Sequence, residues 1–308
     1  MSSIIETQAL TRKFGNLTAV DTLNLKVEAG EVLGFLGPNG AGKTTTIRML
    51  AGMIAPTSGR AWVDSRPIDQ SIEKLHEVIG LLTESPGFYE RLSAWRNLEY
   101  FAGFYPLANK RQQTEKYLRL MGLWDRRNDD VGAFSKGMKQ RLALARALVH
   151  EPKVAFLDEP TAGLDPEAAG QVKELIKQMS AGGQTIFLST HNLSEAEELC
   201  QRIAIFRNRL LALDSPGNLR RSLFQRRNSI RLENPQPDIV ETVRRYAPVK
   251  SVSLSGTRLV VELTDADNDL PGLVQAIVQA GGRVHEVAEE QHSLEEIYLN
   301  LVKEEAEE

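Results

Sequence analysis

The sequence predicts an α/β fold that combines an N-terminal antiparallel β part, a helical insertion and a small C-terminal ferredoxin-like α+β domain. Three observations predict this organisation. Apolar and polar residues alternate near the start of the chain, two near-continuous apolar runs occur further along, and the C-terminal part shows strand and helix patterns in the order β-α-β-β-α-β. Alternation indicates half-buried strands, continuous runs indicate strands covered on both faces of a parallel sheet, and the last order is that of a ferredoxin-like domain.

The first half of the chain contains the predicted antiparallel part and the insertion. Residues 21–30 alternate apolar and polar side chains, which predicts a half-buried strand. Residues 31–51 continue with an apolar run, a glycine-rich turn and a helical pattern, and residues 59–68 contain another short strand. Residues 86–130 show helical spacing without a strand-like run, so we expect a helical subdomain over about 86–135.

The two apolar runs lie at 154–160 and 185–191, and both predict buried parallel strands. The helix expected between them begins after Asp165, because aspartate is a good N-cap and the proline that follows it fits the first helical position. The spacing of Ser194 and Glu197 is that of a capping box and predicts a further helix start.

A change of pattern over 214–228 marks the expected boundary between two domains. This stretch carries a Pro-Gly break and four arginines, and a solvated helix face explains the arginines as well as a special role does. We therefore expect a larger α/β domain over 1–220 and an accessory α+β domain over 221–308, with a final helix over 293–302 and a disordered acidic end.

The composition narrows the function classes. A net charge of −4 over 308 residues gives no electrostatic reason to expect nucleic-acid binding. The single cysteine, Cys200, excludes an internal disulfide and a cysteine-based zinc site, which suits a reducing cytoplasm. The start of the chain has no cleavable leader pattern, and no stretch approaches the roughly 18 consecutive apolar residues of a membrane span. We expect a cytoplasmic chain that reaches a membrane only through a partner.

Residues 37–45, GPNGAGKTT, match the phosphate-binding pattern G-x-x-x-x-G-K-S/T between a predicted strand and a predicted helix. Glycines let the backbone turn its N–H groups around a phosphate, Lys43 offers a positive charge to the β- and γ-phosphates, and the Thr44 hydroxyl is a ligand for Mg²⁺. A glycine-rich turn with a purely structural role fits this context far less well. The sequence therefore predicts an ATP site formed by Gly37, Pro38, Asn39, Gly40, Ala41, Gly42, Lys43, Thr44 and Thr45.

Charged side chains follow both predicted parallel strands. Asp158 ends the first strand, where a carboxylate can hold the Mg²⁺ shell, and Glu159 beside it is placed to orient or deprotonate a water. His191 ends the second strand, at the sheet edge where the phosphates would lie. Taken alone, two acids after a strand also fit a plain strand exit, and a lone histidine also fits a structural position. With the loop at 37–45 upstream, we expect Lys43, Glu159 and His191 to be the catalytic side chains.

These motifs give residues 1–220 a resemblance to the nucleotide-binding subunits of ABC transporters, and more narrowly to the ATPases of ABC-2 and drug-resistance exporters. The C-terminal stretch SLEEIYLNLV is similar to the tail of the accessory domain of such subunits. The resemblance implies a P-loop NTPase of ABC type, an ATPase that uses Mg²⁺ and acts as the motor of a separate membrane permease in an exporter. Six motifs occur in the order of the family: the loop at 37–45, a Gln-loop position at Glu84, FSKGMKQR at 134–141, FLDEP at 156–160, AGLDP at 162–166 and His191.

The motif at 134–141 corresponds to the signature motif LSGGQ of the family, which binds the γ-phosphate of the ATP held by the opposite subunit. By this resemblance, Ser135, Gly137 and the N-terminus of a helix that begins near Met138 contact ATP on a second copy of the chain. A positive helix end attracts a phosphate, so ATP would join two copies and hydrolysis would release them. Lys136 stands where the family has glycine. Its side chain could attract the triphosphate on the opposite copy, and a solvent-facing side chain is equally compatible with the sequence.

Three further positions carry roles through the resemblance alone. Phe14 matches the aromatic residue that stacks on adenine, although a core position is also compatible, and Asp165 matches the acid that communicates between the two ATP sites. Glu84 stands where many relatives have a glutamine that touches Mg²⁺ and the attacking water, and it adds a charge there. The aromatic-rich region from Glu84 to Phe101 matches the groove that receives a helix of the permease, which implies peripheral attachment to the cytoplasmic face of the membrane.

Two other functions use some of the same motifs. Soluble ABC-type ATPases that act on ribosomes or DNA carry two ATPase units, a long coiled coil or a cysteine-rich module, whereas the segment between Lys43 and Asp158 contains no heptad array and no cysteine. A small-molecule P-loop kinase leaves 134–141 without a role and predicts a monomer. ATP-dependent dimerisation of a Glu159→Gln variant would separate the motor from the kinase.

Overall fold

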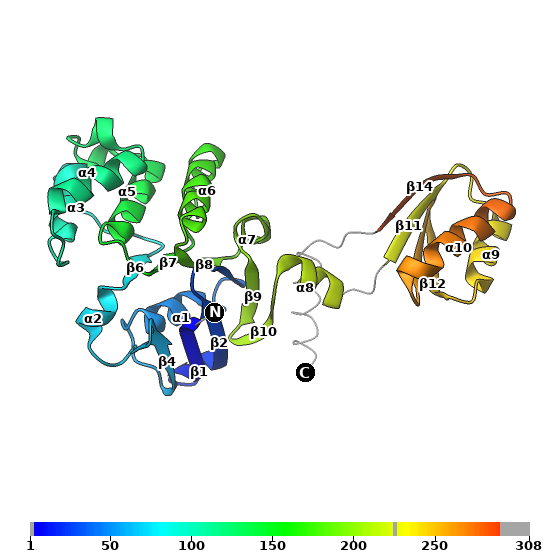
Figure 1. Ribbon diagram of the computed structural model, residues 1–308, viewed down its shortest axis with the longest axis horizontal. Coiled ribbons are helices and arrows are strands. Elements are labelled where there is room, and N and C mark those ends of the chain that lie inside the picture. Colours follow the sequence, from blue (N-terminus) through cyan, green and yellow to red (C-terminus); the bar gives the residue numbers. More distant parts are fainter. Residues whose placement is uncertain (1–2, 224–226, 290–308) are drawn as a thin grey trace. The chain divides into compact units, whose positions relative to one another are not determined.

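The computed structural model describes residues 3–223 and 227–289 of the chain. These residues form two compact units, of which the first ends at Pro216 and the second begins at Gly217 (Figure 1). The first unit is an α/β structure with two sheets and the second is a small α+β structure, so the expected fold class is confirmed. The proposed domain boundary after residue 220 stays a prediction. No helix within the described ranges has the length and hydropathy needed to cross a membrane.

An antiparallel sheet of four strands in the order β2-β1-β4-β5 begins the first unit. Leu23, Leu25 and Val27 are buried while the residues between them are exposed, so the alternation over 21–30 forms the expected half-buried strand. The strands are β1 (Ser3–Phe14), β2 (Leu17–Glu28), β4 (Ser58–Val63) and β5 (Arg66–Pro67).

The second sheet of this unit has six strands in the order β10-β9-β3-β8-β7-β6. Five of them run parallel, and β10 pairs antiparallel with β9. Every residue of β3, β7 and β8 is buried, which explains why these strands appear in the sequence as continuous apolar runs. The strands are β3 (Val32–Leu36), β6 (Ile79–Leu82), β7 (Val154–Asp158), β8 (Thr185–Thr190), β9 (Arg202–Arg207) and β10 (Arg209–Asp214).

A single apolar core joins the two sheets. Fully buried phenylalanines from β3, β8 and β9 pack against one another, with ring centroids 4.5 Å apart between Phe35 and Phe206 and 5.1 Å apart between Phe35 and Phe187. The same cluster includes apolar residues of β1 and β2. Because this core fixes the strands side by side, the carboxyl ends of β3, β7 and β8 meet at one edge of the sheet.

Helices follow or interrupt the strands of the first unit. The helical insertion lies between β6 and β7, where α3, α4 and α5 pack together (Figure 1). The helices are α1 (Lys43–Leu50), α2 (Ile72–His76), α3 (Ala94–Ala102), α4 (Lys110–Leu120), α5 (Lys136–Leu148), α6 (Pro166–Ala181) and α7 (Leu193–Leu199), with short 3₁₀ turns at Trp124–Arg126 and Val131–Ala133.

Of two helix starts predicted from capping residues, the structure confirms one. Asp165 caps α6 as expected, since its Oδ1 accepts the N–H of Ala168 at 2.9 Å and Pro166 is the first helical residue. The capping box at Ser194 and Glu197 is wrong: α7 begins at Leu193, one residue before the serine, and Asn192 caps it. The local reason is that an asparagine, another strong N-cap, stands two residues earlier.

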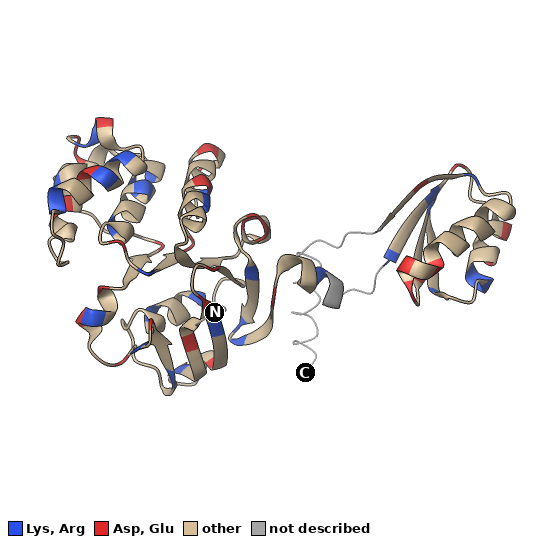
Figure 2. Ribbon diagram, viewed as in Figure 1, with Lys and Arg blue, Asp and Glu red and all other residues tan. Residues whose placement is uncertain are grey.

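The second unit has the predicted β-α-β-β-α-β order. Its antiparallel sheet has the strand order β12-β13-β11-β14, and α9 and α10 share an apolar core with it. The helix expected over 293–302 and the acidic end lie outside the described residues. Basic and acidic residues are interspersed along the helices of both units (Figure 2). The elements are α8 (Pro216–Leu223), β11 (Arg227–Leu232), α9 (Pro237–Arg245), β12 (Val249–Ser255), β13 (Arg258–Leu263), α10 (Ala266–Gln279) and β14 (Val284–Glu289).

Candidate active site

The loop between β3 and α1 follows the edge where the parallel strands end. Gly42 has φ +97°, and a Cβ atom added there would lie 2.1 Å from the carbonyl oxygen of Ala19, so only glycine fits. Gly40 also has a positive φ of +82°, but open space surrounds it. No side chain caps the first turn of α1. The first N–H groups of α1 are therefore available for an anion, as the sequence predicts for a phosphate loop.

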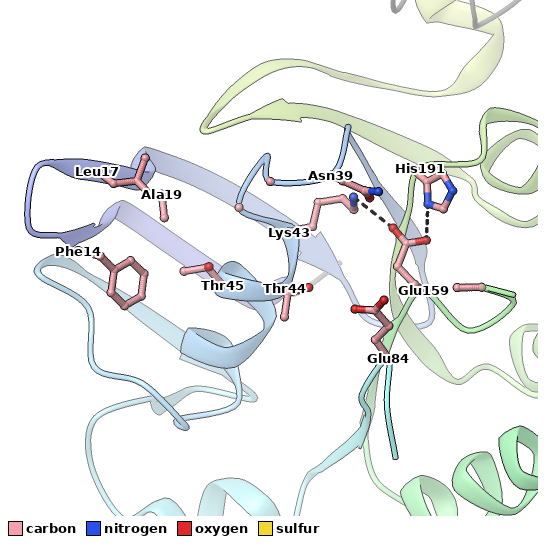
Figure 3. Close-up of a pocket in the computed structure, with 13 residues that line it drawn as sticks. Phe14, Leu17, Ala19, Asn39, Lys43, Thr44, Thr45, Glu84, Glu159 and His191 are labelled. Atoms are coloured by element: carbon pink, nitrogen blue, oxygen red, sulfur yellow. Dashed lines mark hydrogen bonds and ion pairs between the residues drawn. The ribbon is translucent and has the colours of Figure 1, made fainter. Parts of the chain in front are cut away.

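Lys43, the first residue of α1, is buried beneath this loop. Its Nζ donates hydrogen bonds to the carbonyl oxygens of Gly37 at 2.8 Å and Pro38 at 3.1 Å. The same Nζ lies 3.1 Å from Oε1 of Glu159, and only 6% of the lysine side chain and 11% of the glutamate side chain are exposed. This ion pair brings the phosphate loop into direct contact with the residue that follows β7 (Figure 3).

Asp158 and Glu159 differ in their surroundings although they are adjacent. Asp158 ends β7, is 2% exposed, and accepts a hydrogen bond from the Ser189 hydroxyl on β8. Glu159 has φ +50°, a left-handed conformation that costs a non-glycine residue on the order of 1 kcal/mol or more. Its N–H donates to the carbonyl oxygen of Ser189 at 3.1 Å, which helps to hold that conformation. Such strain is frequent where a side chain must point into a site.

His191 follows β8 and completes a row of three charged or titratable side chains. Its Nδ1 lies 2.8 Å from Oε2 of Glu159, so Glu159 contacts Lys43 with one carboxylate oxygen and His191 with the other (Figure 3). The histidine side chain is 53% exposed, whereas the glutamate is almost covered. A carboxylate between two nitrogen groups at the mouth of a pocket is well placed to accept a proton from a bound water.

A pocket of about 390 Å³ lies against this row. Phe14 and Leu17 border it from the hairpin of β1 and β2, and 46% of Phe14 is exposed, so Phe14 is not a core residue (Figure 3). The pocket therefore has an apolar rim on one side and charged groups on the other. Its lining comprises Phe14, Leu17, Ala19, Asn39, Gly40, Gly42, Lys43, Thr44, Thr45, Glu84, Glu159, Ala162 and His191.

Seven expected site residues lie outside the pocket lining. Gly37, Pro38 and Ala41 belong to the phosphate loop and Asp158 ends β7, whereas the other three lie at the start of α5 and before α6. Ser135 caps α5, with its Oγ accepting the N–H of Met138 at 3.2 Å, and α5 begins at Lys136 rather than near Met138. Gly137 packs so closely on α6 that an added Cβ would lie 2.7 Å from Cβ of Ala168. Asp165, the third, caps α6. The start of α5 and the loop that precedes α6 lie close together. A Cβ added to Gly163 would lie 2.2 Å from the Nζ of Lys136, so the exposed lysine lies against this loop.

A second pocket of about 280 Å³ lies beside the helical insertion. We call it the aromatic groove, and its lining includes Met53, Leu81, Phe101, Phe104, Tyr105 and Arg146. Phe104 is 69% exposed and Met53 54% exposed, which is unusual for large apolar side chains. The guanidinium of Arg146 lies 4.8 Å from the ring centre of Phe101 and fixes one wall.

Residues in and next to the region from Glu84 to Phe101 line both pockets. Thr83 lines the aromatic groove and Glu84 lines the first pocket, so adjacent residues of the loop after β6 face different pockets. Phe101 lines the groove, whereas Trp95 packs edge-on against Trp124 at 6.0 Å. The sequence did not indicate Phe104 or Arg146, because they join Phe101 only when α3 and α5 pack together.

Comparisons with known proteins agree with this geometry. Residues 20–162 match the family described as ABC transporter, and residues 215–302 match the family described as ATP-binding protein DrrA1-3-like, C-terminal domain. The chain is 42% identical to the bacitracin transport ATP-binding protein BcrA of Bacillus licheniformis over 70% of its own length and 71% of the relative's. It is 32% identical to the daunorubicin resistance ATP-binding protein DrrA2 of Streptomyces coeruleorubidus over 96% and 94% of the two chains.

Among solved structures, the fold is similar to cbiO1 from Clostridium perfringens, which is part of the ABC transporter complex cbiONQ. The TM-score is 0.65 at 29% identity, and the match covers 71% of this chain and 91% of that one.

Proposed function

Because the chain belongs to the ATP-binding subunits of ABC transporters, we propose that two copies of it close around ATP and use the row of Lys43, Glu159 and His191 to hydrolyse it. The chain is an ATPase and the motor subunit of an exporter-type ABC transporter, in which a separate permease crosses the membrane. The single observation that carries the catalytic proposal is the position of Glu159 between Lys43 and His191 at the phosphate loop.

The phosphate loop holds the triphosphate. The N–H groups of residues 37–45 bind the β-phosphate, and Lys43 provides the positive charge that the transferred γ-phosphate needs as negative charge builds up. Phe14 and the apolar rim of the pocket cover adenine by stacking. Since Lys43 is already paired with Glu159, an incoming phosphate competes for the lysine and frees the glutamate to face water.

Three oxygen ligands suit Mg²⁺ at this position. The Thr44 hydroxyl and the Glu84 carboxylate line the pocket, and Asp158 is buried next to Glu159 with one oxygen bonded to Ser189. The described residues contain no cluster of three His, Cys, Asp or Glu that would form a cage by itself. Mg²⁺ needs none, because it is commonly held by one or two carboxylates together with substrate phosphates. When bound, it neutralises charge on the β- and γ-phosphates.

Hydrolysis proceeds by attack of water on the γ-phosphorus, which breaks the bond to the β-phosphate oxygen. Glu159 accepts the proton of that water, or orients it, and gives the proton back to solvent after phosphate leaves. His191 contacts Glu159 at 2.8 Å, so it holds the carboxylate in place and reaches the γ-phosphate from its exposed side. Both groups lie at strand ends, where the sheet keeps their backbones fixed.

The second copy supplies the missing cover of the site. Members of this family act as dimers with a transmembrane permease. We propose that the dimer contains two copies of this chain and that Ser135, Gly137 and the start of α5 bind the γ-phosphate held by the other copy. The N-terminus of α5 is capped by Ser135, and Asp165 lies in the adjoining loop before α6, so both elements reach the partner together.

The aromatic groove is our proposed docking site for the permease. Its exposed Phe104 and Met53 form an apolar patch of the kind that anchors protein interfaces. A short amphipathic helix fits such a groove better than a polar ligand does. Because Thr83 and Glu84 are adjacent and face the two pockets, movement at the ATP site can pass through this loop to the groove. Docking would hold the chain on the cytoplasmic face of the membrane.

The test is the Glu159→Gln variant. Glutamine keeps the shape but cannot accept the proton of water, so we expect hydrolysis to fall by about 100-fold or more. It also removes the ion pair with Lys43 that competes with the phosphate, so ATP should bind at least as tightly and hold a stable dimer. Light scattering with and without ATP measures the dimer. A monomer in the presence of saturating ATP, or unchanged hydrolysis, would contradict the proposal.

A further inference from the structure

Glu195 is a buried carboxylate that none of the roles above uses. It lies on α7, where its N–H donates to the capping Asn192 at 3.1 Å. Only 3% of the residue is exposed, so its side chain points into the protein, whereas the side chain of Glu198 on the same helix is 36% exposed and pairs with two lysines. Among the described residues, no basic side chain forms an ion pair with Glu195. A buried acid without such a partner is unfavourable and needs a compensating reason.

Two threonine hydroxyls take the place of a basic partner. Thr161 Oγ1 donates to Oε1 of Glu195 at 2.8 Å, and Thr190 Oγ1 donates to Oε2 at 2.5 Å. An ionised carboxylate can only accept hydrogen bonds, so both hydroxyls donate to it, and Thr190 Oγ1 also accepts the N–H of Asn192 at 3.0 Å. The carboxylate therefore bridges the loop after β7 and the end of β8 with one acceptor oxygen for each.

The bridged residues stand next to the groups proposed for hydrolysis. Thr161 lies two residues after Glu159, and Thr190 directly precedes His191. The carbonyl oxygen of Thr190 also accepts the N–H of Gly37 at 3.3 Å, which extends the link to the phosphate loop. Thus one carboxylate connects the segments that carry the proposed base, the histidine and the loop.

Groups around Glu195 shift the pKa of its carboxyl in opposite directions. Burial raises the pKa of its carboxyl and the nearby Glu159 carboxylate raises it further, whereas the threonine hydroxyls and Lys173 lower it. Cys200 lies close enough for the Glu195 charge to add to the effect of burial in raising the pKa of its thiol. The hydroxyls are the contacts that favour the ionised form at short range.

We propose that Glu195 is a positioning residue for ATP hydrolysis, which clamps the loop after β7 to the end of β8 and so holds Glu159 and His191 at their contact distance. The left-handed backbone of Glu159 makes such a clamp necessary, because a strained conformation persists only where its surroundings determine it. The backbone carbonyl of Ser189 accepts the N–H of Glu159, and Glu195 accepts the hydroxyl of Thr161 two residues further along the loop. This inference depends on the proposed roles of Glu159 and His191.

The experiment compares Glu195→Ala, Glu195→Gln and Thr161→Val in the full chain, with Glu198→Ala as the matched control on the same helix. Glutamine keeps an acceptor for Thr190 and offers its amide N–H₂ to Thr161, so it should keep kcat within about threefold of wild type. Alanine removes both bonds and valine removes the bond to Thr161 alone. We expect both to lower kcat by about 10-fold to 100-fold, because small displacements of catalytic groups cost this much, while KM for ATP stays nearly constant.

The readouts separate positioning from mere folding. Thermal melting and KM show whether each variant is folded and binds ATP, and kcat is measured well below the melting temperature. If Glu195→Ala does not fold, Thr161→Val and Glu195→Gln decide the question. Wild-type kcat in folded Glu195→Ala or in Thr161→Val overturns the inference, even if melting falls. Glu159→Gln is assayed in parallel. If Glu159→Gln hydrolyses ATP at the wild-type rate, the proposed role of Glu159 is wrong. If Glu159→Gln is inactive and Glu195→Ala is fully active, only the proposed role of Glu195 is wrong.

Discussion

Two pockets of the first unit, the pocket at the phosphate loop and the aromatic groove, are built in different ways. The pocket at the phosphate loop, of about 390 Å³, is the nucleotide pocket, and residues of one continuous segment, 39–45, form much of its lining. The backbone of this loop has positive φ at Gly40 and Gly42. The aromatic groove, of about 280 Å³, is shaped by side chains from segments far apart in the sequence, such as Met53, Phe104 and Arg146. Backbone geometry requires particular small residues at fixed spacing, whereas an apolar wall only requires suitable volume.

This contrast also separates two tasks. We propose that charged groups at the strand ends bind and cleave ATP and that the aromatic groove receives the permease. The linings of the two pockets adjoin at the loop after β6, where Thr83 and Glu84 are adjacent. Substitutions in the nucleotide pocket should therefore leave permease binding unchanged, and substitutions in the aromatic groove should leave ATP hydrolysis by the isolated chain unchanged.

Lys43→Ala should have the largest effect on hydrolysis. It removes the positive charge at the γ-phosphate and leaves Glu159 without its ion-pair partner, so we expect kcat/KM to fall by about 100-fold to 1,000-fold. Copurification with the permease should persist, because the groove is untouched. Loss of permease binding in folded Lys43→Ala would show that the pockets are not separable.

Gly42→Ala and Gly40→Ala test the role of the backbone in the nucleotide pocket. Both replace a glycine of positive φ, but only at Gly42 would the new Cβ lie 2.1 Å from the carbonyl oxygen of Ala19. We expect Gly42→Ala to weaken ATP binding by about 10-fold to 100-fold and Gly40→Ala by about fivefold, since the second change adds strain without a clash. Titration with a fluorescent ATP analogue measures both, and equal losses would contradict the backbone argument.

Phe104→Ala should weaken permease binding by about 10-fold to 100-fold, as truncation of an exposed aromatic anchor does at other interfaces. ATP hydrolysis by the isolated chain should stay the same. Leu120→Ala is the control, because Leu120 is an exposed apolar residue of the same helical insertion (43% exposed) outside the groove lining. Binding to immobilised permease distinguishes the variants, and equal binding by the two would contradict the proposed docking site.

Glu198→Gln, outside both pockets, should have the smallest effect. Hydrogen bonds from Lys173 and then Lys177 hold the pKa of Glu198 below its ordinary value of 4.5. A lowered pKa stabilises the fold above the ordinary value, and this contribution disappears as pH falls through the lowered one. We expect a destabilisation of a few tenths of a kcal/mol at neutral pH that shrinks as pH falls below 4.5. Urea unfolding at neutral and at acid pH measures it, and a difference that grows in acid would contradict the sign.

The contrast between the pockets also explains what the sequence alone could predict. The phosphate loop is encoded locally, and Asp158, Glu159 and His191 are each preceded by an apolar strand, so their positions at one sheet edge followed from the pattern. The ferredoxin-like order of the second unit was predicted in the same way. Each inference needed only neighbouring residues and the rule that parallel strands end at a common edge.

Other features depend on contacts between distant segments. Glu195 looked like an ordinary helical acid, and only the folded structure brings it to Thr161 and Thr190. Lys136 was compatible with two orientations, and its position against Gly163 depends on how α5 packs beside the loop before α6. The capping box at Ser194 failed because Asn192 competed for the same helix start. Such contacts leave no periodic signal in the sequence.

The central claim is that each ATP site is completed by the signature motif of a second copy. A mixing experiment tests it most directly: Lys43→Ala spoils the loop, Ser135→Arg blocks the motif, and each variant alone should be nearly inactive. Random mixing should restore up to about a quarter of the wild-type rate, because half of the dimers pair an intact loop with an intact motif at one site. A mixture no more active than its components, or full activity of Ser135→Arg alone, would contradict the claim.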